Sequence, residues 1–229
     1  MRGAERRPKS PRAKRRMRAP RTSRFQPARL ACTLRGAMSD LNHPPSEHSV
    51  RYLKSRLRNI PDFPKPGILF KDITPLLADP KAFHIAIDLF AERFLGENLR
   101  AVIGIESRGF IFGGALAARL NASFVPVRKP GKLPYKTDRV AYKLEYGEAE
   151  LEMHVDSLQA GGRVVIVDDL LATGGTASAA AALATRQGAQ VIAYAFVVEL
   201  DFLEGRRRLL ENTAVPPSIY SLVHFGAGE

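Results

Sequence analysis

The stretch Val164-Val165-Ile166-Val167-Asp168-Asp169-Leu170-Leu171-Ala172-Thr173-Gly174-Gly175-Thr176 decides the fold. Four β-branched apolar residues lead into two adjacent carboxylates, and a short loop rich in Gly and Thr follows. An apolar run without alternation is typical of a strand buried on both faces of a parallel sheet. The Ala-rich stretch from Ala177 to Ala184 then favours a helix. The sequence therefore predicts a strand, a loop and a helix, with the loop at the edge where open α/β sheets bind ligands.

The residue types of this loop favour a phosphorylated sugar. Backbone N–H groups at a helix start attract phosphate, and glycine lets the ligand approach the backbone closely. Thr173 and Thr176 add hydroxyl donors, whereas Asp168 and Asp169 would repel phosphate unless they hold sugar hydroxyls or a metal ion. We therefore expect a phosphorylated sugar with Mg²⁺. An ordinary turn with an N-cap would not require both carboxylates, and the loop lacks the Lys of a Walker motif and the spacing of a dinucleotide fold.

The excess of positive charge lies entirely in the N-terminal segment. The 229-residue chain has a net charge of +12, and residues 1–37 hold 13 Lys and Arg against the single acid Glu5. The rest of the chain is electrically balanced, so the charge does not indicate nucleic-acid binding by the body. We expect residues 1–49 to be a basic, disordered extension and 50–229 to be one domain.

Three interpretations of the basic segment remain open. It is an organelle transit peptide, a nucleic-acid-binding arm, or a stretch absent from the mature protein because translation starts at Met38, the interpretation we favour. The segment has no apolar run long enough for a signal peptide or a membrane span. It also contains the only cysteine, Cys32, so the body has no disulfides, which agrees with a cytoplasmic protein.

Strands and helices alternate along the body, which predicts a parallel sheet flanked by helices. Asp79 is expected to cap a helix that begins at Pro80. Further helices are expected at Val50 to Asn59, Gly113 to Leu120 and Leu203 to Leu210, and strands at Ala101 to Ile105, Ser123 to Val127, Val191 to Val198 and Ile219 to Val223, with a strand pair at Val140 to Leu144 and Glu150 to Val155.

Two further segments carry candidate chemistry. Glu106-Ser107-Arg108-Gly109 follows a predicted strand and precedes a helix, as the first motif does, so Arg108 is placed to bind a phosphate or pyrophosphate. Arg128-Lys129-Pro130-Gly131-Lys132-Leu133-Pro134 is a basic Gly/Pro loop, suited to a lid over an anionic leaving group. A solvated run of charge would have the same composition.

Together these motifs resemble those of the type I phosphoribosyltransferases, whose donor substrate is 5-phosphoribosyl 1-pyrophosphate (PRPP). Glu106 to Gly113, Leu144-Glu145-Tyr146-Gly147 and Phe63 to Pro75 resemble the adenine-specific members in particular. The resemblance covers about residues 50 to 223. Many members have an Asp where this chain has Glu106.

The resemblance implies an α/β fold with a small N-terminal hood and the reaction of adenine with PRPP to give AMP and pyrophosphate, a purine-salvage step assisted by Mg²⁺ in a cytoplasmic homodimer. It assigns phosphate and ribose binding to Asp168, Asp169, Ala172, Thr173, Gly174, Gly175, Thr176, Arg108, Lys129 and Lys132. It assigns adenine binding to Leu69, Phe70, Lys71 and Glu106, catalysis to Asp168, Asp169, Arg108, Glu145 and Lys132, and a place in the hood to Tyr146.

Two other functions remain open. The first is a phosphoribosyltransferase for xanthine, hypoxanthine or guanine, because few contacts decide which base is bound. In the other, the protein is a PRPP-sensing regulator that binds nucleic acid through its basic segment. No membrane partner is expected.

Overall fold

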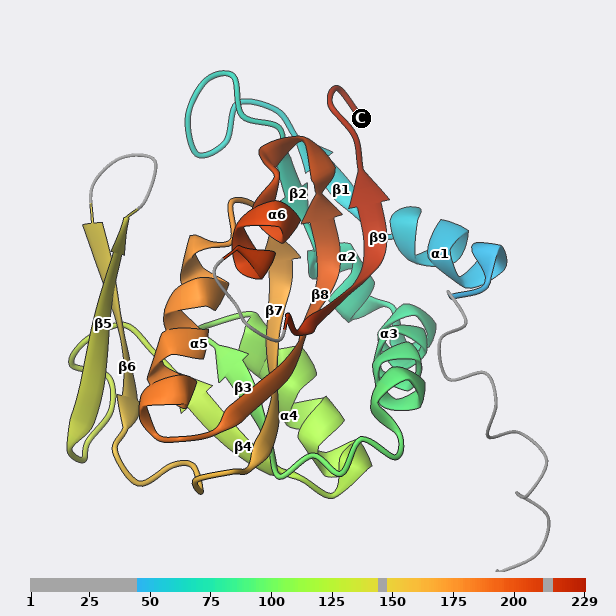
Figure 1. Cartoon of the computed structure of the whole chain (residues 1–229). Helices are drawn as coiled ribbons and strands as arrows, with labels where there is room; N and C mark the ends of the chain where they lie inside the picture. Colours follow the sequence, from blue (N-terminus) through green and yellow to red (C-terminus); the bar gives the residue numbers. More distant parts are fainter. Residues whose placement is uncertain (1–44, 144–147, 212–215) are drawn as a thin grey trace, which may run out of the picture. The chain divides into compact units, whose positions relative to one another are not determined.

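Five parallel strands form the central sheet, in the order β4-β3-β7-β8-β9 (Figure 1). They are β3 (Ala101–Ile105), β4 (Ser123–Val127), β7 (Arg163–Leu171), β8 (Gln190–Leu200) and β9 (Ser218–Phe225). The structure is a computed structural model that describes residues 45–143, 148–211 and 216–229. The α/β class and the parallel sheet expected from the sequence are confirmed.

Helices cover both faces of this sheet. On one face lie α1 (Glu47–Lys54), α2 (Thr74–Ala78), α3 (Pro80–Phe94) and α4 (Gly109–Leu120). On the other lie α5 (Gly175–Arg186) and α6 (Gly205–Leu210), which follows the 3₁₀ helix η1 (Asp201–Leu203). Successive strand residues point to opposite faces, so Val165 and Val167 pack with the first group and Val164 and Ile166 with the second.

Two small antiparallel sheets flank the central one. The hood contains β1 (Arg58–Ile60) paired with β2 (Phe70–Asp72). A hairpin of β5 (Thr137–Lys143) and β6 (Glu148–His154) packs Leu151 and Met153 into the core on the α5 side. The turn of this hairpin, with Glu145 and Tyr146, lies outside the described residues. Within the described part of the chain, no helix is both long and apolar enough to cross a bilayer.

Several element boundaries differ from the sequence-based expectation. Strand β7 continues through Asp168 and Asp169 because its pairing with β8 extends to Leu171. Helix α1 ends at Lys54, since the chain at Arg58 is already paired with β2 in the hood. Helix α4 begins at Gly109, one turn earlier than expected. Tertiary pairing has overridden local propensity at these places.

The predicted cap of α3 is confirmed. The Asp79 carboxylate accepts hydrogen bonds from the backbone N–H groups of Lys81 at 2.9 Å and Ala82 at 3.2 Å, and Pro80 occupies the first helical position. The same carboxylate accepts from the Tyr52 hydroxyl at 2.8 Å and from the Arg56 guanidinium at 2.7 Å. One side chain therefore caps α3 and ties α1 to it.

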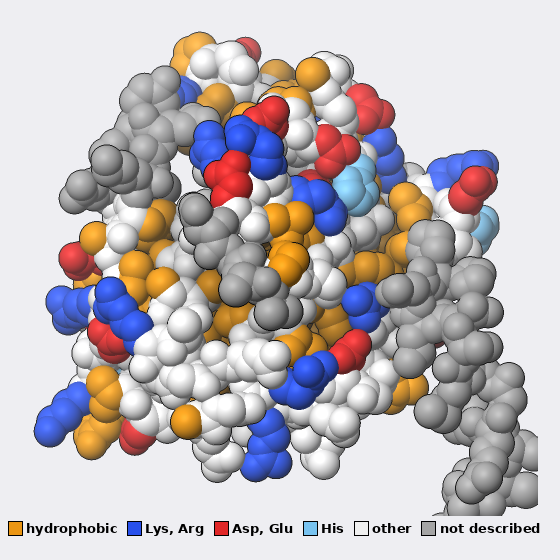
Figure 2. Space-filling view, in the orientation of Figure 1, with side chains coloured by type: hydrophobic (Ala, Val, Ile, Leu, Met, Phe, Trp, Pro, Cys, Tyr) orange, Lys and Arg blue, Asp and Glu red, His pale blue; other side chains and the backbone are white. Residues whose placement is uncertain are grey.

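Acidic and basic side chains intermingle over the face of the molecule that carries α6 (Figure 2). This distribution agrees with the balanced charge of the body in the sequence. It gives this face no broad region of one sign of charge that would attract a polyanion.

Candidate active site

The Gly- and Thr-rich loop joins the carboxyl end of β7 to the first turn of α5. Gly174 has a φ of +80°, a left-handed conformation that glycine adopts without strain, and α5 begins at Gly175. A small cavity of about 70 Å³ opens here, lined by Asp168, residues 170–177 and Phe196. The first N–H groups of a helix have no partner within it, so the loop presents donors around a cavity of suitable polarity for a phosphate.

The second strand-end motif lies directly beside the first. A Cβ atom on Gly109 would lie 2.7 Å from the Val167 carbonyl oxygen and 3.0 Å from Asp168 Oδ1. Only glycine therefore allows α4 to begin so close to the end of β7. This close approach places Arg108, the residue before α4, next to the carboxylates of β7.

Arg108 and Asp169 form an ion pair, with Nε 2.9 Å from Oδ2. Asp169 is buried, while the Arg108 side chain remains 40% exposed. The alignment of this contact is not that of a hydrogen bond, and among the described residues Asp169 Oδ2 has no hydrogen-bond donor. The Arg108 guanidinium also lies 5.5 Å from the centre of the Phe70 ring. Three separate segments of the chain thus meet at one point.

The surroundings of Asp168, the other carboxylate at the end of β7, disfavour its ionised form. Asp168 Oδ1 accepts a hydrogen bond from the Asp169 backbone N–H at 2.9 Å. Burial, followed by the adjacent charge of Asp169, raises the pKa of Asp168 well above its ordinary value. Ionisation of this buried carboxyl group is therefore unfavourable in free energy, and a hydroxyl donor or a cation beside it would make ionisation less unfavourable.

The residues expected to bind the adenine base lie on and around β2. Phe70 is partly buried and packs edge-on against Phe63 at 5.1 Å, while Leu69 is exposed. The Lys71 side chain is buried and donates to Asn59 Oδ1 at 2.8 Å and to the backbone oxygen of Glu229. Lys71 can therefore meet a base in this conformation only through its backbone. The adenine-binding assignment of these residues stays a prediction.

Glu106 pairs with the first residue of the basic loop. Its carboxylate accepts from Arg128 at 2.8 and 3.2 Å and from the Lys129 backbone N–H at 3.2 Å. The hydrogen bond from Arg128 is the main reason that the pKa of Glu106 lies below its usual range. The structure thus gives Glu106 a contact with the loop, and its expected contact with adenine stays a prediction.

The basic loop is organised around one buried carboxylate, Glu152 of β6, which is 1% exposed. Its Oε1 accepts from the backbone N–H groups of Lys132 and Leu133, both at 3.1 Å, and its Oε2 accepts from Thr137 Oγ1 at 3.1 Å. Arg139 Nε lies 3.3 Å from Oε2. Burial alone would raise the pKa of Glu152, but these donors outweigh it and lower that pKa.

Sequence reasoning did not single out Glu152. It lies between Leu151 and Met153, and alternation along a strand predicts an exposed side chain there. The exposed Glu150 on the same strand carries the same sequence signal. Tyr142 of β5 was also missed, although its hydroxyl lies 3.4 Å from Thr176 Oγ1 and so connects the hairpin to the Gly- and Thr-rich loop.

The structure therefore unites some of the expected residues and leaves others apart. Asp168, Asp169, Arg108 and Phe70 converge, with the loop from Ala172 to Thr176 beside them. The Lys129 and Lys132 side chains are exposed on the basic loop. A larger cavity of about 330 Å³ opens at the amino ends of β3, β4 and β7, the opposite edge of the sheet, and holds none of the expected residues.

Comparison with known proteins identifies relatives of this chain. The family model described as "Phosphoribosyl transferase domain" matches residues 72–215. An adenine phosphoribosyltransferase from Sorangium cellulosum is 69% identical over 194 residues, which cover 85% of this chain and 97% of that protein.

Solved structures give the same result. Adenine phosphoribosyltransferase from Thermoanaerobacter pseudethanolicus superposes with a TM-score of 0.72 at 49% identity, covering 77% of this chain and 99% of that one. The enzyme from Saccharomyces cerevisiae, in complex with an imino-altritol bisphosphate and adenine, gives a TM-score of 0.70 at 40% identity, covering 76% of this chain and 98% of that one.

The raised pKa of Asp168 predicts a stability gain on its neutralisation. The folded state binds the Asp168 proton more tightly than the unfolded chain, whose Asp pKa is about 3.9. The free energy of unfolding should therefore fall as the pH rises above that value, and Asp168→Asn should remove this fall. We expect the variant to be more stable than the parent near neutral pH.

Urea unfolding of the ligand-free protein between about pH 4 and pH 8 measures this difference. Asp88→Asn, which changes a carboxylate that is 46% exposed, is the matched control and should leave the pH dependence unchanged. An Asp168→Asn variant whose stability follows the parent at every pH would contradict the electrostatic account.

The contacts of Glu152 predict that Glu152→Ala loosens the lid. The Lys132 and Leu133 amides lose their acceptor in this variant, so their hydrogen exchange should accelerate by about tenfold or more. Amides paired between β5 and β6 should keep their protection, and Glu150→Ala should behave as the parent protein. Unchanged exchange at both amides would show that Glu152 does not organise the lid.

Proposed function

The chain belongs to the adenine phosphoribosyltransferases of the phosphoribosyltransferase family, and from this premise we propose how its own residues perform the reaction. The reaction moves the 5-phosphoribosyl group of PRPP to adenine and yields AMP and pyrophosphate, a step of purine salvage. The observation that carries the assignment of residues is the convergence of Arg108, Asp169 and Phe70 beside the phosphate loop.

The loop from Thr173 to Thr176 holds the 5′-phosphate of PRPP. The start of α5, the left-handed Gly174 and the cavity of about 70 Å³ all support this role. The adjacent carboxylates of Asp168 and Asp169 accept the ribose hydroxyls. Asp169 Oδ2 supports this, because it is buried and lacks a donor among the described residues.

Arg108 binds the pyrophosphate, together with Lys129 and Lys132 when the lid closes. In the ligand-free protein Arg108 neutralises Asp169 instead. Binding of PRPP therefore exchanges partners, since Asp169 gains a hydroxyl donor while Arg108 turns to the anionic leaving group. After the exchange Arg108 has an anionic partner and Asp169 has a hydrogen-bond donor, which limits the electrostatic cost of binding.

The chemical step breaks the C1′–O bond, and its electron pair leaves with the pyrophosphate. N9 of adenine then forms the new bond to C1′ and loses its proton, for which Glu145, outside the described residues, is the proposed acceptor. Cationic side chains stabilise the negative charge that accumulates on the departing group. Lid closure excludes water, which would otherwise hydrolyse PRPP.

Mg²⁺ fits this site as a partner of the substrate. The ion would be held mainly through PRPP, with Asp168 and Asp169 positioned nearby, and it supplies positive charge to the leaving pyrophosphate. The raised pKa of Asp168, and the lack of a hydrogen-bond donor to Asp169 Oδ2 among the described residues, support a cation or hydroxyl donor at this place.

Phe70 packs against one face of the adenine ring, and the backbone near Leu69 and Lys71 reads its edge. The partial burial of Phe70 and its place above Arg108 support a ring-stacking role. Glu106 pairs with Arg128 of the basic loop, so its contribution to base recognition depends on the position of that loop.

The proposal extends to assembly and location. The enzyme works as a homodimer in the cytoplasm, as the family resemblance implies. Residues 1–49 precede the domain at 50–229, and the matched family segment, residues 72–215, lies within this domain. The balanced charge of the body supports small-molecule rather than nucleic-acid partners.

Pyrophosphate release with PRPP and Mg²⁺ tests the reaction and the base together. Adenine, hypoxanthine, guanine, xanthine and uracil are supplied in parallel, and we expect release with adenine alone. Release with a different base would support the PRPP site but contradict the assignment of the hood residues to adenine binding. Binding of PRPP without release on any base would favour the regulator.

Substitutions test the assignment of roles. Arg108→Ala and Asp169→Asn should each lower kcat/KM by more than about tenfold, because each removes a charge that contacts PRPP. Arg119→Ala and Asp88→Asn are matched controls, since these residues form a surface ion pair at 2.6 Å and should leave the kinetics near the parent values. Kinetics near the parent values in both site variants would contradict this assignment.

A further inference from the structure

The phosphate loop rests directly on the first turn of α6. Gly205 is buried, and a Cβ atom there would overlap the Ala172 carbonyl oxygen and lie 2.9 Å from Leu171 Cδ1. In the other direction, a Cβ atom on Gly174 would lie 2.9 Å from the Gly205 carbonyl oxygen. Backbone approaches backbone closely at both glycines, and the side chains of Leu171 and Leu209 pack beside this contact. A shift of α6 must therefore move the loop.

Helix α6 has little stability of its own. It has six residues, no side chain caps its start, and the preceding Glu204 has a left-handed φ of +54°. A helix this short is unstable in isolation, and tertiary contacts must hold it. Leu209 supplies one such contact, because it is buried in the core beneath α5.

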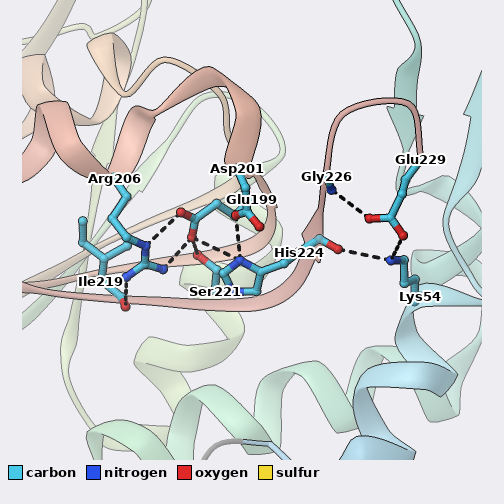
Figure 3. A network of polar contacts seen from close by, with 9 residues as sticks. All are labelled: Lys54, Glu199, Asp201, Arg206, Ile219, Ser221, His224, Gly226 and Glu229. Carbon is cyan, nitrogen blue, oxygen red and sulfur yellow. Dashed lines mark hydrogen bonds and ion pairs between the residues drawn. The ribbon is translucent and has the colours of Figure 1, made fainter.

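Arg206 supplies the second contact, at the end of the helix that touches the loop (Figure 3). Its Nε and one terminal nitrogen donate to the two carboxylate oxygens of Glu199, at 2.9 and 2.6 Å. Its other terminal nitrogen donates to the Ile219 carbonyl at 3.0 Å. Ser221 Oγ donates to the same carboxylate at 2.5 Å. The planar fork of arginine thus fixes α6 to β8 and β9 at once.

The Glu199 cluster does not have the character of a cation site. Glu199, Asp201 and His224 bring possible ligand atoms together. However, both Glu199 oxygens already accept from Arg206, and a cation would have to displace that positive charge. His224 Nδ1 lies 2.8 Å from Asp201 Oδ1 and 3.9 Å from Glu199 Oε2. The buried carboxylate is therefore satisfied by the protein itself.

We propose that Arg206 is a positioning residue for PRPP binding: its bidentate pair with Glu199 holds α6 so that Gly205 supports the phosphate loop from below. The role rests on the proposed function of that loop. Arg206 acts through Gly205 and the Ala172–Gly174 backbone and has no contact with the ligand itself. Loss of the pair should loosen the loop and weaken phosphate binding, while the base site across the sheet edge keeps its geometry.

Steady-state kinetics of Arg206→Met, with PRPP and adenine varied separately, test this role. We expect the KM for PRPP to rise by about tenfold or more, because displacement of a binding loop is costly even from a distance. The KM for adenine should stay within about twofold. Arg206→Lys keeps the charge without the fork, so it should recover part of the PRPP affinity. Equal rises in both KM values would indicate general damage and overturn the proposal.

Arg207→Met is the matched control. Arg207 is the next residue on α6 and forms exposed ion pairs with Glu204 and Glu211, both at 2.7 Å. Its loss removes an arginine from the same helix without disturbing the contact with the loop. Both KM values should stay within about twofold of the parent, as exposed pairs of this kind contribute little. A PRPP defect equal to that of Arg206→Met would overturn the specific role of Arg206.

Gly205→Ala changes the contact between α6 and the phosphate loop directly. It tests the proposal even if Arg206→Met fails to fold. It keeps the Arg206–Glu199 pair and pushes a methyl group against the Ala172 carbonyl. The expected result is the same selective loss of PRPP affinity, and a parent-like KM for PRPP would refute the proposal. Calorimetric titration with PRPP alone separates this test from the proposed reaction, because it measures the loop even if no base is converted.

Discussion

The parallel pairing of β7 between β3 and β8 is the constraint on which the site depends. Val167 of β7 lies opposite Gly104 of β3, so β3 ends beside the two carboxylates of β7, while β7 continues to Leu171. The chain after β3 therefore turns next to these carboxylates, which lets Arg108 reach Asp169. A slip of one residue in this register would turn both carboxylates of β7 to the opposite faces and separate the pair.

Electrostatic tension in the ligand-free site follows from this geometry. Among the described residues, Arg108 forms an ion pair with Asp169, while its charge only partly offsets the unfavourable burial of Asp168. Packing fixes the strand, so the charges cannot move apart. The site that we propose is therefore preorganised for hydroxyl donors and cations.

The sequence allowed the fold and the two strand-end motifs to be predicted, because both arise from local patterns. The apolar run from Val164 to Val167 and the Gly- and Thr-rich loop can be recognised within a stretch of about a dozen residues. The end of β7 was misplaced, since its last residues are ordered by pairing with β8. Glu152 and Arg206 were not identifiable at all. Their roles come from backbone amides and a carboxylate that fold against them from elsewhere in the chain.

Three buried carboxylates illustrate what separates a functional acid from a structural one. Glu152 receives donors from the lid, and Glu199 receives an arginine fork and a serine hydroxyl, so the oxygens of both are satisfied by the chain itself. Asp169 is also buried, yet its Oδ2 has an ion pair and no hydrogen-bond donor within the described residues. An unmet acceptor is costly in the interior. Its neighbour Asp168 lines the small cavity at the end of β7, so the lack of a donor is explained if a ligand supplies it, whereas the satisfied carboxylates hold the basic loop and α6 in place.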